Sequence, residues 1–163
     1  MKRLIEDKLQ AWYKSNNKKP LIIKGARQVG KTYSIREFAK KNYDQLVEIN
    51  FEKQLEYGVL FEKTRRPQEI LEYLQLSFLD ISFDSKTLLF LDEIQASPGV
   101  LTALKFLAEE FPTDIICSGS VLGVAIASSS SFPVGYVETW EMVPLTFTEF
   151  YGLLESVMIG WQD

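Results

Sequence analysis

The stretch GARQVGKT (residues 25–32) decides the fold of this chain through the two elements on either side of it. It directly follows PLIIK (residues 20–24), a short apolar run of the kind that forms a buried strand. It leads into KTYSIREFAKK (residues 31–41), whose apolar residues recur at helical spacing. A phosphate-binding loop of the pattern G-x-x-x-x-G-K-S/T requires this strand–loop–helix context. The context disfavours the alternative, a glycine turn with an exposed lysine.

Phosphate binding explains the residue types in this loop. Gly25 and Gly30 supply backbone freedom where a side chain would strain the loop or collide with the ligand. Lys31 is expected to reach the β- and γ-phosphates, and the hydroxyl of Thr32 to ligate Mg²⁺. The helix that begins at Lys31 adds the positive end of its dipole. The expected nucleotide-binding residues are Gly25, Ala26, Arg27, Gln28, Val29, Gly30, Lys31 and Thr32.

Strands and helices alternate along the rest of the chain. A leading helix is expected within residues 1–16, and further helices at 67–79 and 97–111, the last with Ser97 as its N-cap. Apolar runs predict buried strands at 46–51, 87–93 and 114–120, and a mixed pattern predicts an edge strand at 136–143. This alternation favours an α/β sandwich around a mainly parallel sheet, with any ligand at the carboxyl ends of the strands.

Two carboxylates follow the apolar run in LLFLDEIQ (residues 88–95). A phosphate loop needs a carboxylate that orients the metal, and Asp92 at the strand end is expected to hold Mg²⁺ or its water beside Thr32. Glu93 is expected to orient and deprotonate water for in-line attack. A hydrolase needs such a residue, whereas a small-molecule kinase does not. The alternative for Glu93 is a solvated loop carboxylate.

Two hydroxyls stand at the tip of the next strand, in CSGS (residues 117–120). Ser118 or Ser120 is expected to contact the γ-phosphate or the attacking water there. Small polar residues are also ordinary turn formers at strand ends, and the sequence leaves that alternative open.

Charge is unevenly spread over the chain, whose net charge is −4. Residues 1–42 hold 12 Lys/Arg and 3 Asp/Glu, a local +9, whereas 43–100 and 101–163 carry −6 and −7. The basic part could favour a phosphorylated ligand or a polyanion, but no Arg/Lys stripe interleaved with aromatics supports a dedicated nucleic-acid binder. A single cysteine, no signal peptide and no apolar run of about 20 residues predict a cytoplasmic protein without a membrane span.

Four segments together point to a known family. GARQVGKT, LLFLDEIQ, CSGSVLGVA and SFPVGYVETWEMVPLTFTEFYG follow one another in this order over nearly the whole chain. They resemble the AAA+-like P-loop ATPases of bacteria and archaea that pair an N-terminal AAA domain with a C-terminal domain of unknown function. The last segment is the most specific to that family, because a phosphate loop alone fits many unrelated proteins.

The resemblance implies a fold and a set of roles. The fold is a P-loop NTPase three-layer sandwich around a five-stranded, mainly parallel sheet of the additional-strand type, with strand order 5-1-4-3-2. Residues 25–32 correspond to the phosphate loop, Asp92 and Glu93 to the Walker B pair, and Ser118 to the sensor position. ATP is then the substrate and Mg²⁺ the cofactor. Residues 1–163 are expected to form a single ATPase domain.

The resemblance also implies that the chain is an N-terminal fragment of a longer protein, because family members continue beyond it into a C-terminal module. No sensor arginine or arginine finger can be assigned in the sequence. The isolated fragment is therefore expected to bind nucleotide and to hydrolyse it slowly, because the charge of the transition state lacks an arginine partner.

Several functions remain open on the sequence alone. The first is Mg²⁺-dependent ATP hydrolysis, and the second is a non-catalytic sensor in which ATP occupancy changes a binding surface. A small-molecule kinase is disfavoured because the acidic residues 101–163 offer no clear acceptor pocket or basic lid. Nucleic-acid binding through residues 1–31 has weak support, and a homo-oligomer or a protein partner is open. No Asn-Lys-x-Asp guanine-reading motif occurs, which favours ATP over GTP.

Overall fold

The computed structural model describes residues 4–27, 29–120, 132–143 and 147–160. Its strands are β1 (Leu21–Lys24), β2 (Gln45–Asn50), β3 (Thr87–Asp92), β4 (Asp114–Gly119) and β5 (Glu138–Glu141). Its helices are α1 (Leu4–Lys14), α2 (Lys31–Asn42), α3 (Leu55–Lys63), α4 (Pro67–Ser77), α5 (Pro98–Glu110) and α7 (Phe147–Gly160), and a 3₁₀ turn, η1, covers Ile94–Ala96. Each strand that the sequence predicted is present, with ends that differ by a few residues.

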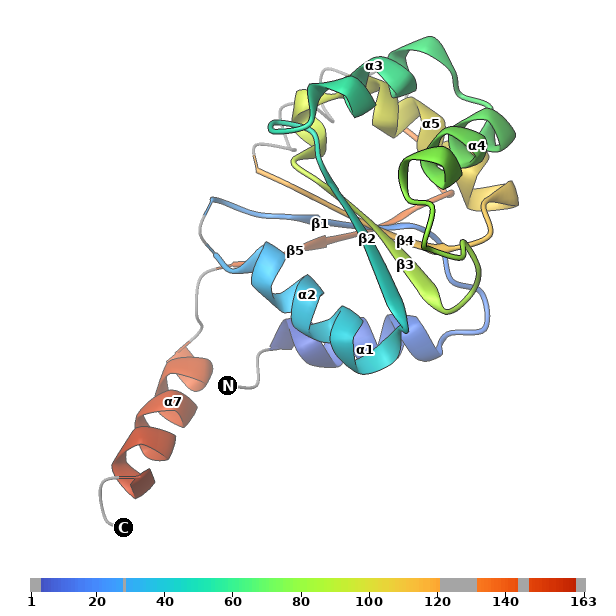
Figure 1. Cartoon of the computed structure of the whole chain (residues 1–163). Coiled ribbons are helices and arrows are strands. Elements are labelled where there is room, and N and C mark those ends of the chain that lie inside the picture. The colour runs from blue at the N-terminus through green and yellow to red at the C-terminus, as the bar shows by residue number, and fades with distance from the viewer. Residues whose placement is uncertain (1–3, 28, 121–131, 144–146, 161–163) are drawn as a thin grey trace.

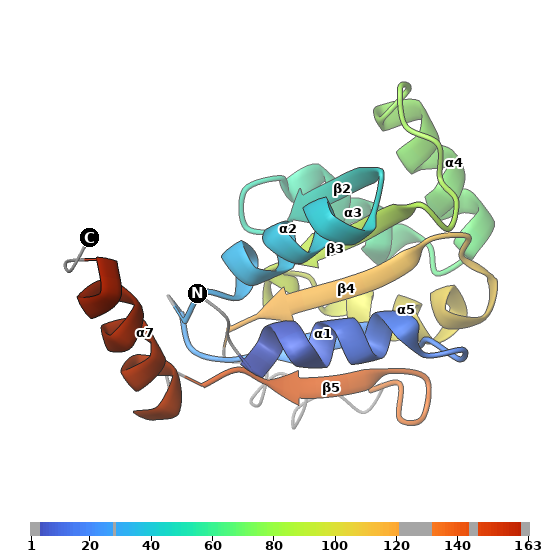
Figure 2. The same ribbon diagram turned by 90° about the horizontal axis from the view of Figure 1, so that it is seen from below.

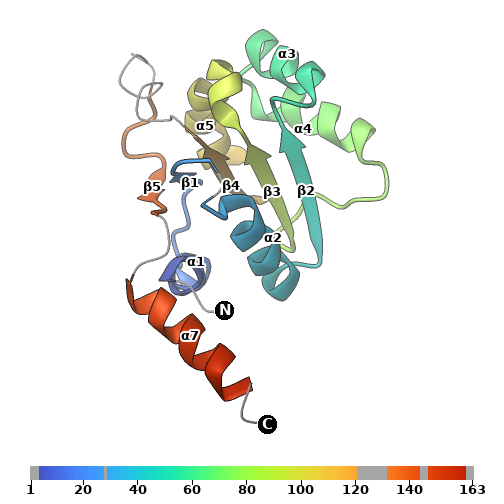
Figure 3. The ribbon, with the colours of Figure 1, turned by 90° about the vertical axis from the view of Figure 1, so that its left-hand side faces the viewer.

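The described strands form one sheet in the order β2-β3-β4-β1-β5, and their pairings are parallel. Figure 3 shows the five strands side by side in this order. Counted from β5, this is the predicted order 5-1-4-3-2, and β5 lies at an edge as its mixed pattern predicted. Because parallel strands point the same way, the carboxyl ends of β1, β3 and β4 lie along one edge of the sheet.

Helices cover both faces of the sheet, so the molecule has three layers (Figures 1 and 2). Successive residues of a strand point to opposite faces. On β3, Leu88 and Phe90 belong to the core cluster that α1 and α2 cover, while Leu89 and Leu91 belong to the cluster under α3, α4 and α5. Burial on both faces explains why this strand is a continuous apolar run and not an alternating one.

One local prediction needs correction, and another is confirmed in position but not in its side-chain contact. The strand predicted at 87–93 ends at Asp92, because Glu93 has left-handed backbone angles (φ 56°, ψ 46°) and begins the turn η1. Ser97 does occupy the N-cap position of α5, but its side chain makes no capping hydrogen bond. Its Oγ atom is buried and has no hydrogen-bond partner among the described residues.

The sequence did not predict two helices, α3 and α7. α3 packs against α5 with Tyr57 and Phe61 buried. α7 leads away from the sandwich in all three views, and residues 151–160 on it are mostly exposed. Across the part of the chain that is described, no helix has the length and apolar character to cross a membrane.

Candidate functional site

The three motifs predicted to carry chemistry lie together at the carboxyl edge of the sheet. Residues 25–27, 29 and 30 lie in the loop between β1 and α2, Asp92 ends β3, and Ser118 lies near the end of β4. Strand register brings these three segments together: Ile23 of β1 is paired with Ser118 of β4, and β4 is the neighbour of β3. The site is therefore built from segments that are up to about 90 residues apart in sequence but adjacent in the sheet.

The two loop glycines are required for different reasons. A Cβ atom at Gly25 would lie 2.4 Å from the backbone oxygen of Met142, closer than real Cβ contacts allow. The same segment is tied to β1, because the Met142 N–H donates to the Lys24 oxygen (2.8 Å). Gly30 has φ 93° at the N-cap of α2, a left-handed conformation that favours glycine. Close approach of the β5 exit, which the sequence did not indicate, therefore explains Gly25.

Lys31 folds back onto its own loop. Its Nζ donates to the backbone oxygens of Gly25 (2.8 Å) and Ala26 (2.7 Å). The side chain is only 7% exposed, and this burial lowers the pKa of Lys31, whereas the charges of Glu93 and Asp92 raise it. These two hydrogen bonds leave one of the three ammonium donors for another acceptor. The ammonium is therefore held by backbone carbonyls of the loop itself.

Asp92 is the centre of the polar contacts at the strand ends. Thr32 Oγ1 donates to its Oδ2 (3.1 Å), and Ser118 Oγ donates to its Oδ1. The Glu93 N–H also donates to Oδ1 (2.9 Å). The carboxylate is 4% exposed, and Ser118 is fully buried. The structure thus joins Thr32, Asp92 and Ser118 in one hydrogen-bonded cluster.

This cluster suits a Mg²⁺ ion by the chemistry of its donors. Mg²⁺ prefers oxygen ligands and is commonly held by one or two carboxylates together with substrate phosphates and water. Thr32 and Asp92 place a hydroxyl and a carboxylate oxygen 3.1 Å apart beside the phosphate loop. Within the described residues no group of three or more His, Cys, Asp or Glu side chains is gathered for a metal. A site of this kind does not need one.

Glu93 makes a contact that the sequence did not suggest. Its Oε2 accepts a hydrogen bond from Gln95 Nε2, and the same nitrogen lies 3.3 Å from Ser120 Oγ and 3.4 Å from Glu52 Oε1. Ser120, which was predicted to contact a phosphate or water, therefore contacts Gln95 in this structure. Gln95 lies in the LLFLDEIQ segment, two residues after Glu93, so the sequence did contain an amide side chain near this carboxylate.

The remaining loop residues have separate surroundings. Arg27 forms an ion pair with Glu52 (2.9 Å), and its side chain is 67% exposed. Val29 is buried in the core cluster on the α1/α2 face. Gln28, which was predicted to bind nucleotide, lies outside the described residues.

Acidic side chains offset part of the basic N-terminal region. Ion pairs join Lys18 to Asp114, Arg36 to Glu48, and Lys40 to Glu37. Paired cations offer less charge to a phosphate backbone than free ones. Of these three pairs, only that of Lys18 lies within residues 1–31, so nucleic-acid binding through that segment stays a prediction of the sequence.

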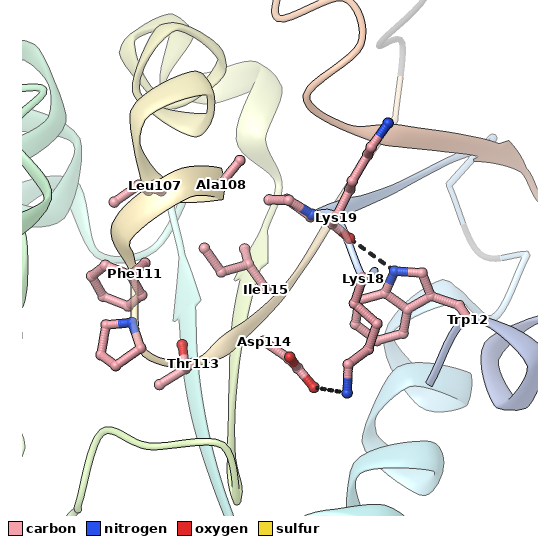
Figure 4. A pocket seen from close by; sticks show the side chains of 11 residues that line it. Trp12, Lys18, Lys19, Leu107, Ala108, Phe111, Thr113, Asp114 and Ile115 are labelled. Carbon is pink, nitrogen blue, oxygen red and sulfur yellow. Dashed lines mark hydrogen bonds and ion pairs between the residues drawn. The ribbon is translucent and has the colours of Figure 1, made fainter. Parts of the chain in front are cut away.

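A separate pocket lies at the opposite, amino-terminal edge of the sheet, between the segments that precede β1 and β4 (Figure 4). Trp12 Nε1 donates to the Lys19 backbone oxygen there (2.8 Å), and Lys18 pairs with Asp114 (2.9 Å). Because the two edges of a parallel sheet are a strand length apart, this pocket is not part of the phosphate-loop site.

Comparisons with known proteins agree with this architecture. The Aeropyrum pernix Orc1 protein, solved in complex with DNA, aligns with 93% of this chain and 46% of its own, with a TM-score of 0.59 and 14% identity. A Thermotoga maritima RuvB protein aligns with 94% of this chain and 50% of its own, with a TM-score of 0.55 and 15% identity. Such identities show the fold alone, and this chain spans about half the length of either protein.

The search of curated proteins found no match to this sequence. A family model described as an AAA domain matches residues 17–151, which include the phosphate loop, β3 with Asp92, β4 with Ser118, and β5. Since this match covers most of the chain and the sheet has the strand order of P-loop NTPases, the chain belongs to the AAA domain family of AAA+-like P-loop ATPases.

Proposed function

We propose that this AAA domain binds ATP with Mg²⁺ and hydrolyses the bond between the β- and γ-phosphates. The observation that carries the proposal is the cluster of Thr32, Asp92 and Ser118 beside the phosphate loop, with Glu93 next to it. Water attacks the γ-phosphorus, the bond from that phosphorus to the β–γ bridging oxygen breaks, and ADP and phosphate are the products. Mg²⁺, when bound, supplies positive charge that stabilises the phosphate oxygens.

The chain's own residues divide the remaining work. When ATP binds, Lys31 gives up its hydrogen bonds to the Gly25 and Ala26 oxygens and donates to phosphate oxygens instead. Until then, the loop carbonyls keep its ammonium group next to the binding site. Thr32 and Asp92 supply the oxygen atoms that would hold the metal. Glu93 accepts the proton of the attacking water. Ser118 donates a hydrogen bond to the Asp92 carboxylate and so would keep it oriented when a metal is bound.

Three finer points belong to this proposal. ATP is favoured over GTP because the sequence has no guanine-reading motif. Coupling of hydrolysis to a C-terminal module and residence in the cytoplasm stay predictions of the sequence. The alternative function is a nucleotide sensor without catalysis. In that case the contacts of the phosphate loop, Thr32 and Asp92 would serve only to bind the nucleotide.

Phosphate release tests the proposal directly. We expect the chain to release phosphate from ATP slowly and only with Mg²⁺, and Glu93→Gln to reduce the rate by at least about 100-fold, a typical contribution of a general base. Glu109→Gln, at an exposed position on α5, is the matched control and should leave the rate unchanged.

Three other outcomes would contradict the proposal in different ways. Binding of ATP without phosphate release by the wild-type chain would establish the sensor. Transfer of the γ-phosphate to a metabolite, with little free phosphate, would indicate a kinase. A rate that Glu93→Gln does not change would remove Glu93 from the catalytic role.

A further inference from the structure

The side chain of Gln95 lies against the carboxylate to which catalysis is assigned. The turn η1 brings it there: Glu93 adopts left-handed backbone angles, Ile94 is fully buried as an anchor, and the Ala96 N–H donates to the Glu93 oxygen (3.1 Å). Because of this tight turn, the side chain of Gln95 points toward the side chain of Glu93. Gln95 Nε2 then donates to Glu93 Oε2.

Charge fixes which end of the amide faces Glu93. The Gln95 nitrogen has two N–H donors, and three acceptors surround it: the Glu93 and Glu52 carboxylates and the Ser120 hydroxyl. A flipped amide would place its oxygen against two carboxylates, which is repulsive. In the observed orientation Oε1 is buried and has no hydrogen-bond partner among the described residues. A buried acceptor without a partner is costly, so this orientation depends on the attraction between the amide nitrogen and the carboxylates.

The three acceptors do not contribute equally. A hydrogen bond to a charged group is roughly twice as strong as one between neutral groups. The contact with Glu52 is long (3.4 Å), and Glu52 is already paired with the exposed Arg27, so it contributes little. Ser120 is buried (2% exposed) at the end of β4, but its contact with the amide is also long (3.3 Å) and its hydroxyl is neutral, so it contributes little as well. The main effect of Gln95 is therefore on Glu93.

We propose that Gln95 is the positioning residue for Glu93, holding its carboxylate beside the phosphate loop, with Ser120 at the end of β4 in contact with the same amide. The catalytic part of this inference rests on the proposed ATP hydrolysis. A free glutamate side chain samples many rotamers, and fixing it in advance removes an entropy cost from the step that needs it. Small misplacements of a reacting group reduce rates strongly.

A double-mutant cycle tests the contact without reference to catalysis. Gln95→Met removes the amide while keeping the length of the side chain, and it also removes the unpaired Oε1. We expect it to lower the melting temperature of the nucleotide-free chain by about 2–5 °C. In a Glu93→Ala chain the same substitution should lower it by less than half as much, because the partner is gone. Gln75→Met, at an exposed glutamine on α4, is the matched control and should show no such dependence on Glu93→Ala.

Steady-state kinetics tests the positioning role. Gln95→Met should reduce kcat for ATP hydrolysis by about 10-fold while KM changes by less than about twofold, since Gln95 contacts no part of the phosphate loop itself. In a Glu93→Gln chain, Gln95→Met should reduce kcat no further, because its effect acts through Glu93.

The outcomes separate this inference from the proposed function. Equal melting shifts in the presence and absence of the Glu93 side chain would overturn the inference whether or not the chain hydrolyses ATP. Coupled melting shifts with an unchanged kcat would also overturn it, because the contact would then be structural. Coupled shifts in a wild-type chain that releases no phosphate would uphold the contact and overturn the proposed hydrolysis.

Discussion

Glu93 shows at the scale of a single residue how backbone and chemistry are linked at this site. It is the non-glycine residue with a positive φ (56°) among the described residues. Left-handed backbone costs a residue with a Cβ atom roughly 1–2 kcal/mol relative to ordinary conformations. The conformation ends β3 at Asp92 and turns the chain so that the Gln95 side chain contacts Glu93. The strain is located where the proposed general base is placed.

Comparing two substitutions at Glu93 measures this strain separately from the lost carboxylate. Glu93→Gly and Glu93→Ala both remove the contact with Gln95, but only glycine adopts positive φ without steric cost. We expect the glycine variant to be more stable than the alanine variant by about 1 kcal/mol in urea unfolding. At Glu109 on α5 the order should reverse, because glycine is the poorer residue in a helix by about 1 kcal/mol. Equal stability of the two Glu93 variants would show that the turn relaxes when the side chain is removed.

At the scale of elements, the sequence predicted those with a clear hydrophobic pattern and missed two helices that lack one. The strand of residues 87–92 was evident because both its faces are buried and the residues from Leu88 to Leu91 are all apolar. α3 was missed because Gly58 interrupts it and only Tyr57 and Phe61 are buried, too few for a visible stripe. α7 was missed although Thr146 and Glu149 have the spacing of a capping box before an apolar run.

The end of α2 is tied to the start of β4 by a hydrogen bond that should stabilise both elements. Tyr43 Oη donates to Asp114 Oδ2 (2.6 Å), and the tyrosine is 8% exposed. Tyr43→Phe should lower the free energy of unfolding by about 1–2 kcal/mol, less than for an isolated charged bond because Lys18 remains on Asp114. Urea unfolding measures the change, with Tyr73→Phe on the exposed face of α4 as the control.

This contact also gives a pH dependence with a definite sign. Burial, followed by the bond to Asp114, raises the pKa of Tyr43 above its ordinary value of 10.0. A group with a raised pKa stabilises the folded chain below its unfolded pKa, and this stabilisation is lost as pH rises above about 10. The stability advantage of wild type over Tyr43→Phe should therefore shrink at pH 10–11. An advantage that stays constant over this range would show that Tyr43 titrates normally in the folded state.

At the scale of the whole molecule, the location of the site was predictable and its internal contacts were not. In a parallel sheet the carboxyl ends of neighbouring strands share one edge, so motifs that each follow an apolar run must converge there. The return of Lys31 to the oxygens of Gly25 and Ala26 depends on a loop conformation that only the structure supplies. The need for Gly25 arises from Met142, more than 100 residues away in sequence. Such long-range contacts leave no local pattern.

Ligand binding at this edge should stabilise the whole domain, because α2, β3 and β4 are parts of one packed unit. ATP with Mg²⁺ at about 100 times its Kd adds roughly 2.7 kcal/mol to the free energy of unfolding. For a chain of this size we expect the melting temperature to rise by roughly 5–11 °C. ATP with a chelator should produce a smaller rise, because the loop amides and Lys31 still contact the phosphates.

Two substitutions assign the Mg²⁺-dependent part of that rise to the Thr32–Asp92 pair. Thr32→Val removes the hydroxyl that lies 3.1 Å from Asp92 Oδ2 and keeps the shape of the side chain, and Asp92→Asn removes the charge. Either should abolish the difference between ATP with and without Mg²⁺ while keeping much of the rise with ATP alone. Thr102→Val on α5 is the matched control and should keep the full difference. If Thr32→Val retained it, the metal would be held elsewhere, and the hydroxyl of Thr32 would serve only to fix the Asp92 carboxylate.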